Sequence, residues 1–156
     1  MSFEGEIRLV PFDRTYLERS WEWLRDPEIK TMTMAGEFTR EDQERFFEDL
    51  PSRQDYKIWG VESADGQPIG AGGLKHIQGS DGEFWCYIGE RPYWGRGIGG
   101  RILEACEVEA QKLGIDRLTM IALENNERSI RAYEKMGFQF VSRHEEDGTV
   151  TLAKSI

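Results

Sequence analysis

The stretch that decides the fold reads Tyr93-Trp94-Gly95-Arg96-Gly97-Ile98-Gly99-Gly100-Arg101-Ile102-Leu103. Four glycines stand between positions 95 and 100, and apolar residues then recur at helical spacing. That apolar series is Ile98, Ile102, Cys106, Ala110 and Leu113. Glycines let the backbone approach a ligand closely, and the free N–H groups at a helix N-terminus attract phosphate. The stretch therefore predicts an anion-binding loop that opens into an amphipathic helix.

Other glycine loops fit this stretch less well. A P-loop needs Lys and then Ser or Thr after its last glycine, where this chain has Arg101 and Ile102. Gly95, Gly97 and Gly100 satisfy the dinucleotide pattern G-x-G-x-x-G, but that loop normally lies in the first βα turn of its domain. About 90 residues precede this one, which disfavours a dinucleotide-binding oxidoreductase. A glycine-rich turn before an ordinary helix remains an alternative for the loop taken alone.

Periodicity and turn residues predict one mixed sheet with helices, an α+β (mixed α/β) fold. We expect strands at residues 6–10, 56–62, 68–76, 83–89, 117–123, 138–143 and 149–154. We expect four helices, at residues 13–26 (or from 15), 39–50, 98–113 and 126–136. The first should stop at Pro27, and Thr39 to Asp42 form a capping box for the second, whose buried stripe would be Phe46, Phe47 and Leu50. Residues 32–38 are interpreted as a substrate-side loop or a connection that plugs the core.

Length and composition indicate a single domain over residues 1–156, with 38% hydrophobic residues. No apolar run approaches the ~20 residues of a membrane span. Residues 1–6 carry acid where a signal peptide would carry base, so we expect a cytoplasmic protein. Cys86 and Cys106 fall at interior positions, and His76 and His144 are isolated, so neither a disulfide nor a metal site is predicted.

The formal net charge of −9 makes nucleic acid and anionic membranes poor partners and would attract amines. An anionic ligand at the glycine loop needs a local positive patch. Arg91, Arg96 and Arg101 are the residues predicted to supply it.

The loop resembles the acetyl-CoA loop of the GCN5-related N-acetyltransferases (GNAT superfamily), which reads Gln/Arg-x-x-Gly-x-Gly/Ala. Trp94 stands where the family has Gln or Arg, as in the branch with ribosomal-protein N-terminal and amino-sugar acetyltransferases. A second segment, from Asn126 to Phe138, resembles the family's N-x-x-A-x-x-x-Y-e-k-x-G-F motif. The predicted element order is also the family's. The resemblance covers nearly the whole chain and implies a single GNAT-like domain whose six- to seven-stranded sheet is splayed between its fourth and fifth strands.

The resemblance also implies site residues. Acetyl-CoA would be held by Tyr87, Ile88, Gly89, Trp94, Gly95, Arg96, Gly97, Ile98, Gly99, Gly100, Asn126 and Tyr133. Tyr133 would protonate the departing thiolate, or only pack on the pantetheine arm. Glu83 would take the proton of the amine, or only be a solvated charge at a strand end. Asn126 would contact the cofactor, or only cap its helix.

The implied activity is transfer of an acetyl group from acetyl-CoA to a primary amine by direct attack in a ternary complex, without a metal. Residues 21–29 resemble enzymes that act on amino-sugar nucleotides or protein N-termini, whereas the acidic surface also suits polyamines or aminoglycosides. A non-catalytic acyl-CoA-binding regulatory module is the alternative from another class. The partners expected are a small-molecule or peptide amine and, since dimers are the commonest assembly, a second copy of the chain.

Overall fold

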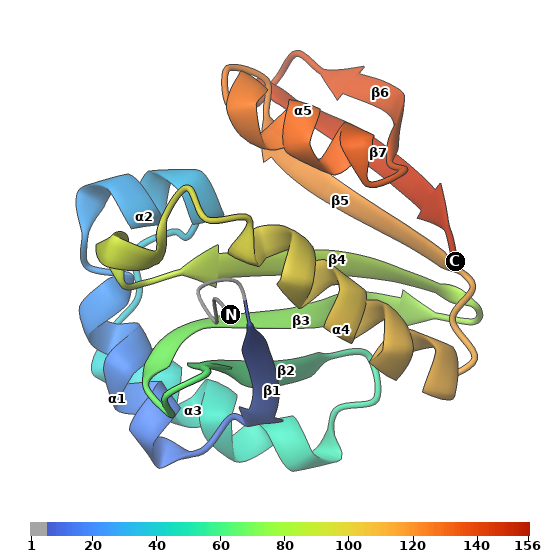
Figure 1. The fold of residues 1–156 in the computed structure, drawn as a ribbon. Helices are drawn as coiled ribbons and strands as arrows, with labels where there is room; N and C mark the ends of the chain where they lie inside the picture. Colours follow the sequence, from blue (N-terminus) through green and yellow to red (C-terminus); the bar gives the residue numbers. More distant parts are fainter. Residues whose placement is uncertain (1–5) are drawn as a thin grey trace.

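The computed structural model describes residues 6–156 as one seven-stranded sheet with the strand order β1-β2-β3-β4-β5-β7-β6 (Figure 1). The strands are β1 (Ile7–Pro11), β2 (Lys57–Ser63), β3 (Pro68–Gln78), β4 (Asp81–Ile88), β5 (Arg117–Leu123), β6 (Gln139–His144) and β7 (Thr149–Ser155). The helices are α1 (Arg14–Trp23), α2 (Pro27–Thr33), α3 (Arg40–Asp49), α4 (Ile98–Lys112) and α5 (Glu127–Lys135), with 3₁₀ turns at Leu50–Ser52 and Arg91–Tyr93. The mixed fold predicted from the sequence is confirmed. Residues 1–5, on which the prediction of no signal peptide partly rests, lie outside the described residues.

The sheet splits along its parallel pair of strands, β4 and β5, which are paired only over their first three residues. β4 and β5 pair only at Asp81–Glu83 and Arg117–Thr119, and beyond these residues the two strands part (Figure 1). All the other neighbouring strands are antiparallel. The predicted splay between the fourth and fifth strands is therefore confirmed, and it divides the sheet into two wings.

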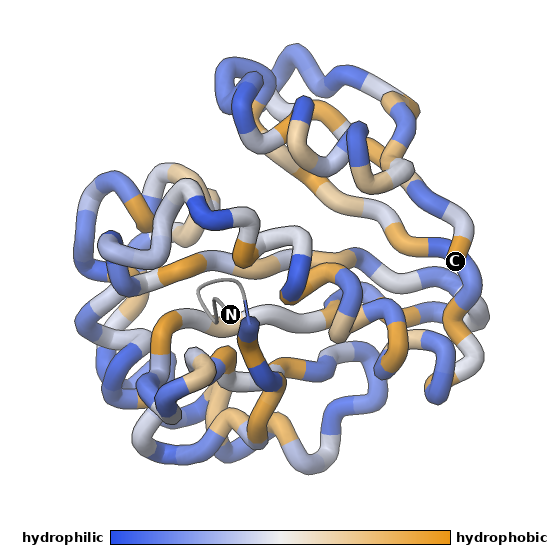
Figure 2. The backbone as a smooth tube through the Cα atoms, viewed as in Figure 1, coloured by the Kyte–Doolittle hydropathy of each residue, from blue (hydrophilic) through white to orange (hydrophobic). Residues whose placement is uncertain are grey.

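Helices cover both faces of the sheet. Side chains alternate along each strand, so each strand contributes packing residues to both faces. On one face Phe84 packs edge to face against Tyr133 of α5, and Gly72 of β3 leaves room for Ile102 of α4. On the other face Tyr87 packs edge to face against Trp23 of α1. Hydrophobic residues are correspondingly concentrated on the central strands and on α4 (Figure 2). The predicted stripe of α4 is buried except for Leu113, which is 45% exposed because it caps the helix after its last turn.

The prediction of four helices is wrong, because Pro27 starts a helix instead of only ending one. The Asp26 carboxylate accepts a hydrogen bond from the Glu28 N–H at 2.9 Å, and Pro27 occupies the first helical position, where the missing N–H costs nothing. Helix α2 therefore occupies the start of the predicted loop 32–38. It ends at Met34, whose φ of 57° is left-handed.

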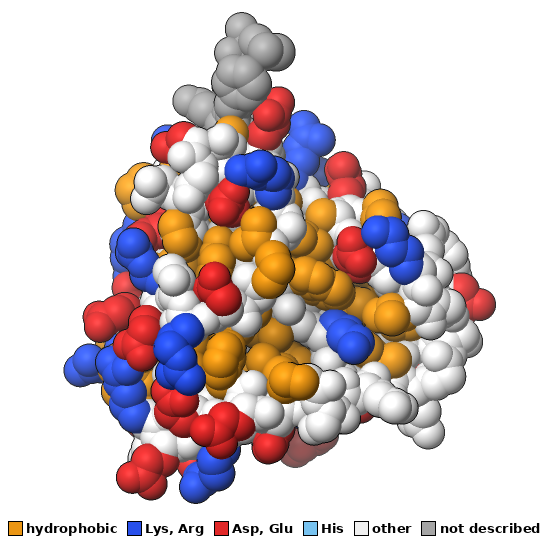
Figure 3. All heavy atoms as spheres, turned by 90° about the horizontal axis from the view of Figure 1, so that it is seen from below, with side chains coloured by type: hydrophobic (Ala, Val, Ile, Leu, Met, Phe, Trp, Pro, Cys, Tyr) orange, Lys and Arg blue, Asp and Glu red, His pale blue; other side chains and the backbone are white. Residues whose placement is uncertain are grey.

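The capping box of α3 is confirmed, with the Thr39 N–H donating to the Asp42 carboxylate at 2.9 Å. Its predicted stripe is only half-buried at Phe46 and Phe47, and Gln43 is its buried residue. Seen from below, the face that carries β1, β2 and α3 has a central group of hydrophobic side chains within a border of mixed charge (Figure 3). No helix within residues 6–156 is long and apolar enough to cross a membrane.

Gly89 is expected to be required for packing at the end of β4. A Cβ atom there would lie 2.2 Å from the Trp23 ring. Both Gly89 and Trp23 are buried in close-packed surroundings, which resist the shift that this contact would require. The substitution Gly89→Ala should lower the free energy of unfolding by about 1–3 kcal/mol, measured by urea denaturation.

Gly36→Ala is the matched control, because a Cβ at Gly36 has no neighbour within 4 Å. Its effect should stay within about 0.5 kcal/mol. Equal stabilities of the two variants would contradict the close packing of Gly89 on Trp23.

Candidate active site

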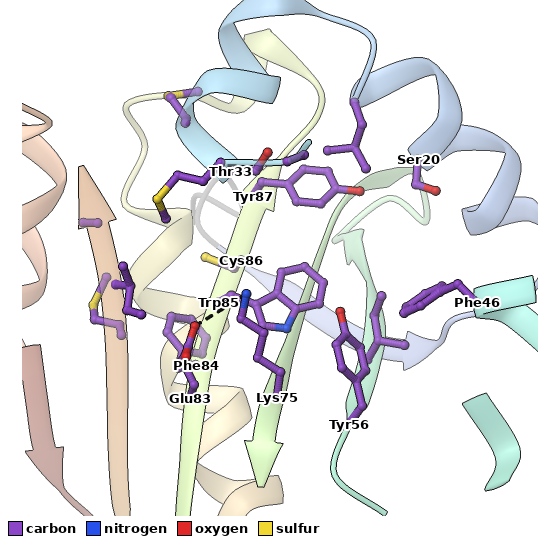
Figure 4. Close-up of a pocket in the computed structure, with 18 of the residues that line it drawn as sticks. Ser20, Thr33, Phe46, Tyr56, Lys75, Glu83, Phe84, Trp85, Cys86 and Tyr87 are labelled. Atoms are coloured by element: carbon purple, nitrogen blue, oxygen red, sulfur yellow. Dashed lines mark ion pairs between the residues drawn. The ribbon is translucent and has the colours of Figure 1, made fainter. Parts of the chain in front are cut away.

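A cavity of about 420 Å³ lies beside β4 and extends into the gap between β4 and β5. Most of its wall is apolar or aromatic and comes from α1, α2, α3, β4 and the segments next to them: Leu17, Leu24, Met32, Met34, Phe38, Phe46, Tyr56, Trp85 and Tyr87. On the gap side it reaches Met120, Ala122, Asn126, Ser129 and Tyr133. Figure 4 shows Trp85 and Tyr87 pointing toward Tyr56 and Ser20, while Cys86 points the other way. The cavity thus reaches both faces of β4 through the gap between β4 and β5.

Glu83 is a buried carboxylate at the point where β4 and β5 stop pairing. Its Oε1 lies 3.0 Å from the His76 Nδ1. Its Oε2 lies 3.5 Å from the Lys75 Nζ, and Figure 4 shows this ion pair. Both basic residues belong to the neighbouring strand β3. The structure therefore places Glu83 in the cavity wall, and the interpretation of Glu83 as a solvated strand-end charge is wrong.

Tyr133 approaches the same gap from α5. Its hydroxyl lies 3.2 Å from the Cys86 Sγ, and a Cβ on Gly99 at the start of α4 would lie 3.0 Å from this hydroxyl. Burial, together with the nearby Cys86, raises the pKa of Tyr133 well above its usual value. The phenol therefore stays protonated at neutral pH and is available as a donor.

The glycine loop delivers the N-terminus of α4 to the mouth of the gap. Gly97 is the N-cap with φ of 75°, a left-handed conformation that glycine adopts without strain, and no side chain caps the helix. Trp94 donates its indole N–H to the Ile88 carbonyl at 2.9 Å, so its side chain anchors the loop to β4. The first N–H groups of α4 are left for an anionic ligand.

The predicted positive patch needs correction. The Arg91 guanidinium is bonded to Asp26 at 2.6 Å and to Glu28 at 2.9 Å, so it ties the loop to α2. Arg101 lies 3.8 Å from Glu104. Within residues 6–156, neither Arg96 nor Arg128 has a carboxylate within 4.0 Å, and the Arg128 Nη2 would lie 3.5 Å from a Cβ on Gly95. Sequence reasoning missed Arg128, although it stands in the second motif, two residues after Asn126.

The backbone of β4 presents only part of the predicted cofactor contacts to the gap. The Gly89 N–H donates to the Ile69 carbonyl of β3 at 2.7 Å. Because peptide groups alternate in direction along an antiparallel strand, Tyr87 also faces β3, whereas Phe84, Cys86 and Ile88 face the gap. Asn126 lines the cavity, and its side chain makes no capping bond.

The chain matches a known family model over most of its length. Residues 6–139 match the family model described as the acetyltransferase (GNAT) domain. The chain belongs to the GNAT acetyltransferase family. This match identifies the family and not the branch with ribosomal-protein and amino-sugar acetyltransferases. A search of curated protein sequences found no match to the chain.

Solved GNAT-like structures share the fold at low sequence identity. A spermidine N-acetyltransferase from Vibrio cholerae, in complex with CoA and spermine, has a TM-score of 0.88 at 15% identity and covers 96% of this chain and 95% of its own. An aminoglycoside acetyltransferase with coenzyme A and kanamycin has a TM-score of 0.80 at 18% identity, with the same coverages of 96% and 95%. A dodecameric spermidine N-acetyltransferase from Vibrio cholerae has a TM-score of 0.78 at 15% identity, with coverages of 96% and 92%.

The GNAT site has features that fit acetyl-CoA. The uncapped N-terminus of α4, with Arg96 and Arg128 beside the loop, suits a pyrophosphate. The peptide groups of Phe84 and Cys86 face the gap, where an amide-containing arm can pair with them. Within residues 6–156, no group of three or more His, Cys, Asp or Glu side chains could hold a metal ion.

The pH dependence of Cys86 alkylation should report the environment of the gap. Burial is the main cause that raises the pKa of the Cys86 thiol to about 11, and the Tyr133 hydroxyl partly opposes this rise. Because only the thiolate reacts, modification by iodoacetamide should increase about tenfold per pH unit between pH 7 and 10. Peptide mass spectrometry can follow the modification residue by residue.

Tyr133→Phe should move this profile to higher pH, because it removes a hydrogen bond that favours the thiolate. The fully buried Cys106 is the internal control and should stay unmodified. A rate of Cys86 modification that levels off by pH 8 would contradict the apolar character of the gap.

Proposed function

We propose that this chain transfers the acetyl group of acetyl-CoA to a small-molecule primary amine by direct attack within a ternary complex. One observation carries this proposal. A buried carboxylate, Glu83, and a protonated phenol, Tyr133, line the same cavity from opposite faces of β4. A base for the amine and an acid for the leaving group are the two proton-transfer roles that aminolysis of a thioester needs.

In this proposal the backbone holds the co-substrate. The N–H groups of Gly99 and Gly100, with Arg96 and Arg128, would bind the pyrophosphate at the N-terminus of α4. The gap-facing peptide groups of Phe84 and Cys86 would pair with the pantetheine arm in the manner of an added strand. Acetyl-CoA supplies an acetyl thioester, and these contacts would aim it toward Tyr133 and Glu83.

Glu83 would accept a proton from the bound ammonium group, which leaves a neutral amine able to attack. Tyr133 would donate its proton to the leaving thiolate, and the proton that the attacking nitrogen loses as the amide forms would restore the phenol. The raised pKa of Tyr133 suits this step, because the same surroundings raise the pKa of a thiol, as Cys86 shows at about 11. A phenol and a thiol have similar ordinary pKa values, and burial raises both, so the proton transfer between them stays easy.

The acceptors of the similar structures support a small amine over an amino-sugar nucleotide or a protein N-terminus, since those proteins were crystallised with spermine and kanamycin. The cavity wall favours an amine with an apolar body. Its two carboxylates are both engaged, Glu83 by Lys75 and His76, and Asp42 by Arg45 and the Thr39 N–H. Aromatic side chains such as Trp85 and Tyr56 line the cavity and would contact the hydrocarbon body of such an amine.

Polyamines and aminoglycosides remain the second candidate class, favoured by the shared fold. A non-catalytic acyl-CoA-binding module is less favoured, because it would not need both Glu83 and Tyr133 in the wall of one cavity. Self-association also remains a prediction, which the dodecameric assembly of one similar enzyme supports.

A panel of amines tests the proposed function. We expect acetyl-CoA-dependent release of CoA with cyclohexylmethylamine at a kcat/KM about tenfold above those for spermidine and kanamycin, because the cavity has few free carboxylates. Thiol release and mass spectrometry of the product provide the measurement. Faster turnover of spermidine would select the polyamine class, and acetyl-CoA binding without turnover of any amine would select the non-catalytic module.

Tyr133→Phe tests the role of the phenol. The variant should lose about a hundredfold in kcat, while its Kd for acetyl-CoA changes only a few-fold, because the ring still packs and only the proton donor is lost. Tyr16→Phe is the matched control, because the Tyr16 hydroxyl is also buried, has no hydrogen-bond partner within residues 6–156, and lies outside the cavity. A Tyr133→Phe enzyme with unchanged kcat would remove the phenol from the chemistry.

A further inference from the structure

His76 occupies a backbone irregularity that directs its imidazole onto Glu83. In the ladder between β3 and β4, Lys75 pairs with Glu83 and Gln78 pairs with Asp81. Two residues of β3, His76 and Ile77, therefore stand opposite the single residue Gly82, which is a β-bulge. His76 has φ of 51°, a left-handed conformation that is uncommon for any residue with a side chain.

The bulge changes which side chains can reach Glu83. In a regular strand His76 would point away from the face that Lys75 and Glu83 share, because side chains alternate. With the bulge, the His76 Nδ1 lies 3.0 Å from the Glu83 Oε1. The Ile77 N–H donates to the Asp55 carbonyl at 3.1 Å, so the irregular backbone keeps its hydrogen bonds. Strained backbone of this kind persists where the surrounding structure enforces it, often beside a functional site.

The hydrogen-bonded pair of Glu83 and His76 extends from the cavity wall to the solvent-exposed surface. The Glu83 side chain is 10% exposed and faces the cavity, whereas the His76 side chain is 72% exposed. A proton on Glu83 therefore has a hydrogen-bonded neighbour that is in contact with bulk water. The other charged groups that face His76 are Lys75 on its own strand and Asp55, which is bonded to Arg53.

The chemistry requires such a route. Conversion of a protonated amine and acetyl-CoA to an acetylated amine and free CoA thiol releases one proton per turnover. If Glu83 takes the ammonium proton, the carboxylate must lose it again before the next cycle. A lysine ammonium cannot accept a proton at neutral pH, but an imidazole can, which selects His76 over Lys75.

We propose that His76 is a positioning residue for Glu83 and also carries the amine's proton from Glu83 to solvent. This inference rests on the proposed acetyltransferase function. In each turnover the amine N–H bond breaks and Glu83 gains the proton. The O–H bond of Glu83 then breaks as the Nε2–H tautomer of the His76 imidazole gains the proton at Nδ1. The imidazolium releases its Nε2 proton to water, which leaves an Nδ1–H donor for the Glu83 carboxylate, and a turn of the exposed ring then presents the free Nε2 for the next proton.

His76→Asn separates positioning from proton transfer. The Asn side-chain amide can place a nitrogen donor where the imidazole has Nδ1, and Asn tolerates a left-handed backbone. An amide cannot take up and release a proton. We expect kcat to fall about tenfold or more at low buffer concentration, with little change in the KM for either substrate. Imidazole added as a buffer should restore kcat in proportion to its concentration, whereas wild-type kcat should not depend on buffer.

His144→Asn is the matched control, because His144 lies on β6, where its Nε2 is 2.8 Å from the Thr151 hydroxyl. It should behave as wild type. Glu83→Gln should lose activity that no buffer restores; an unchanged rate in that variant would remove Glu83 as the base and with it that part of the proposed function. A His76→Asn enzyme with full, buffer-independent kcat beside an inactive Glu83→Gln would overturn the relay alone. A loss of kcat that imidazole leaves unrepaired would reduce His76 to positioning.

Discussion

The structure depends on the parting of two parallel strands after three paired residues. Backbone N–H and C=O groups that leave a sheet ladder must find other partners, because unsatisfied groups are costly when buried. The Ile88 carbonyl finds the Trp94 indole, and the gap-facing groups of Phe84 and Cys86 lie along the unpaired edge of β4. An edge of this kind can bind an extended amide chain, so the parting of the strands leaves a surface that suits the pantetheine arm proposed above.

The glycine loop is coupled to the acceptor side of the molecule. Arg91 follows β4 and reaches back to Asp26 and Glu28 at the N-terminus of α2, whose C-terminal end lines the cavity. The bond to Arg91 is the main cause that lowers the pKa of Asp26, which agrees with a charge-assisted contact. The segment that leads into the glycine loop and the helix that borders the cavity are therefore held by the same side chain.

The sequence predicted the parts of the fold that local chemistry encodes. Alternating strands, the Asp-Gly turns and the helix after Gly97 were recognisable because each has its signal within a few residues. Helix α2 was missed because Asp26-Pro27 is both a helix stop and a helix start, and the Asp26 carboxylate that caps the helix is also bonded to Arg91, 65 positions further on. The positions of Arg128 and His76 depend on tertiary contacts, since nothing local shows that an arginine lies by Gly95 or that a histidine is left-handed.

Strand β4 separates the two ligands of the proposed reaction by the alternation of its own side chains. Glu83, Trp85 and Tyr87 lie on one face of β4, whereas Phe84 and Cys86 lie on the other face against Tyr133, and both sets line the cavity. Two substrates on opposite sides of a continuous sheet could not meet. They can meet here only where β4 has lost its neighbour, and Glu83 is the last residue before that point. The position of the carboxylate thus follows from the topology, because a base placed earlier on β4 would lie within the paired sheet, and one placed later would lie beyond the reach of the bulge in β3.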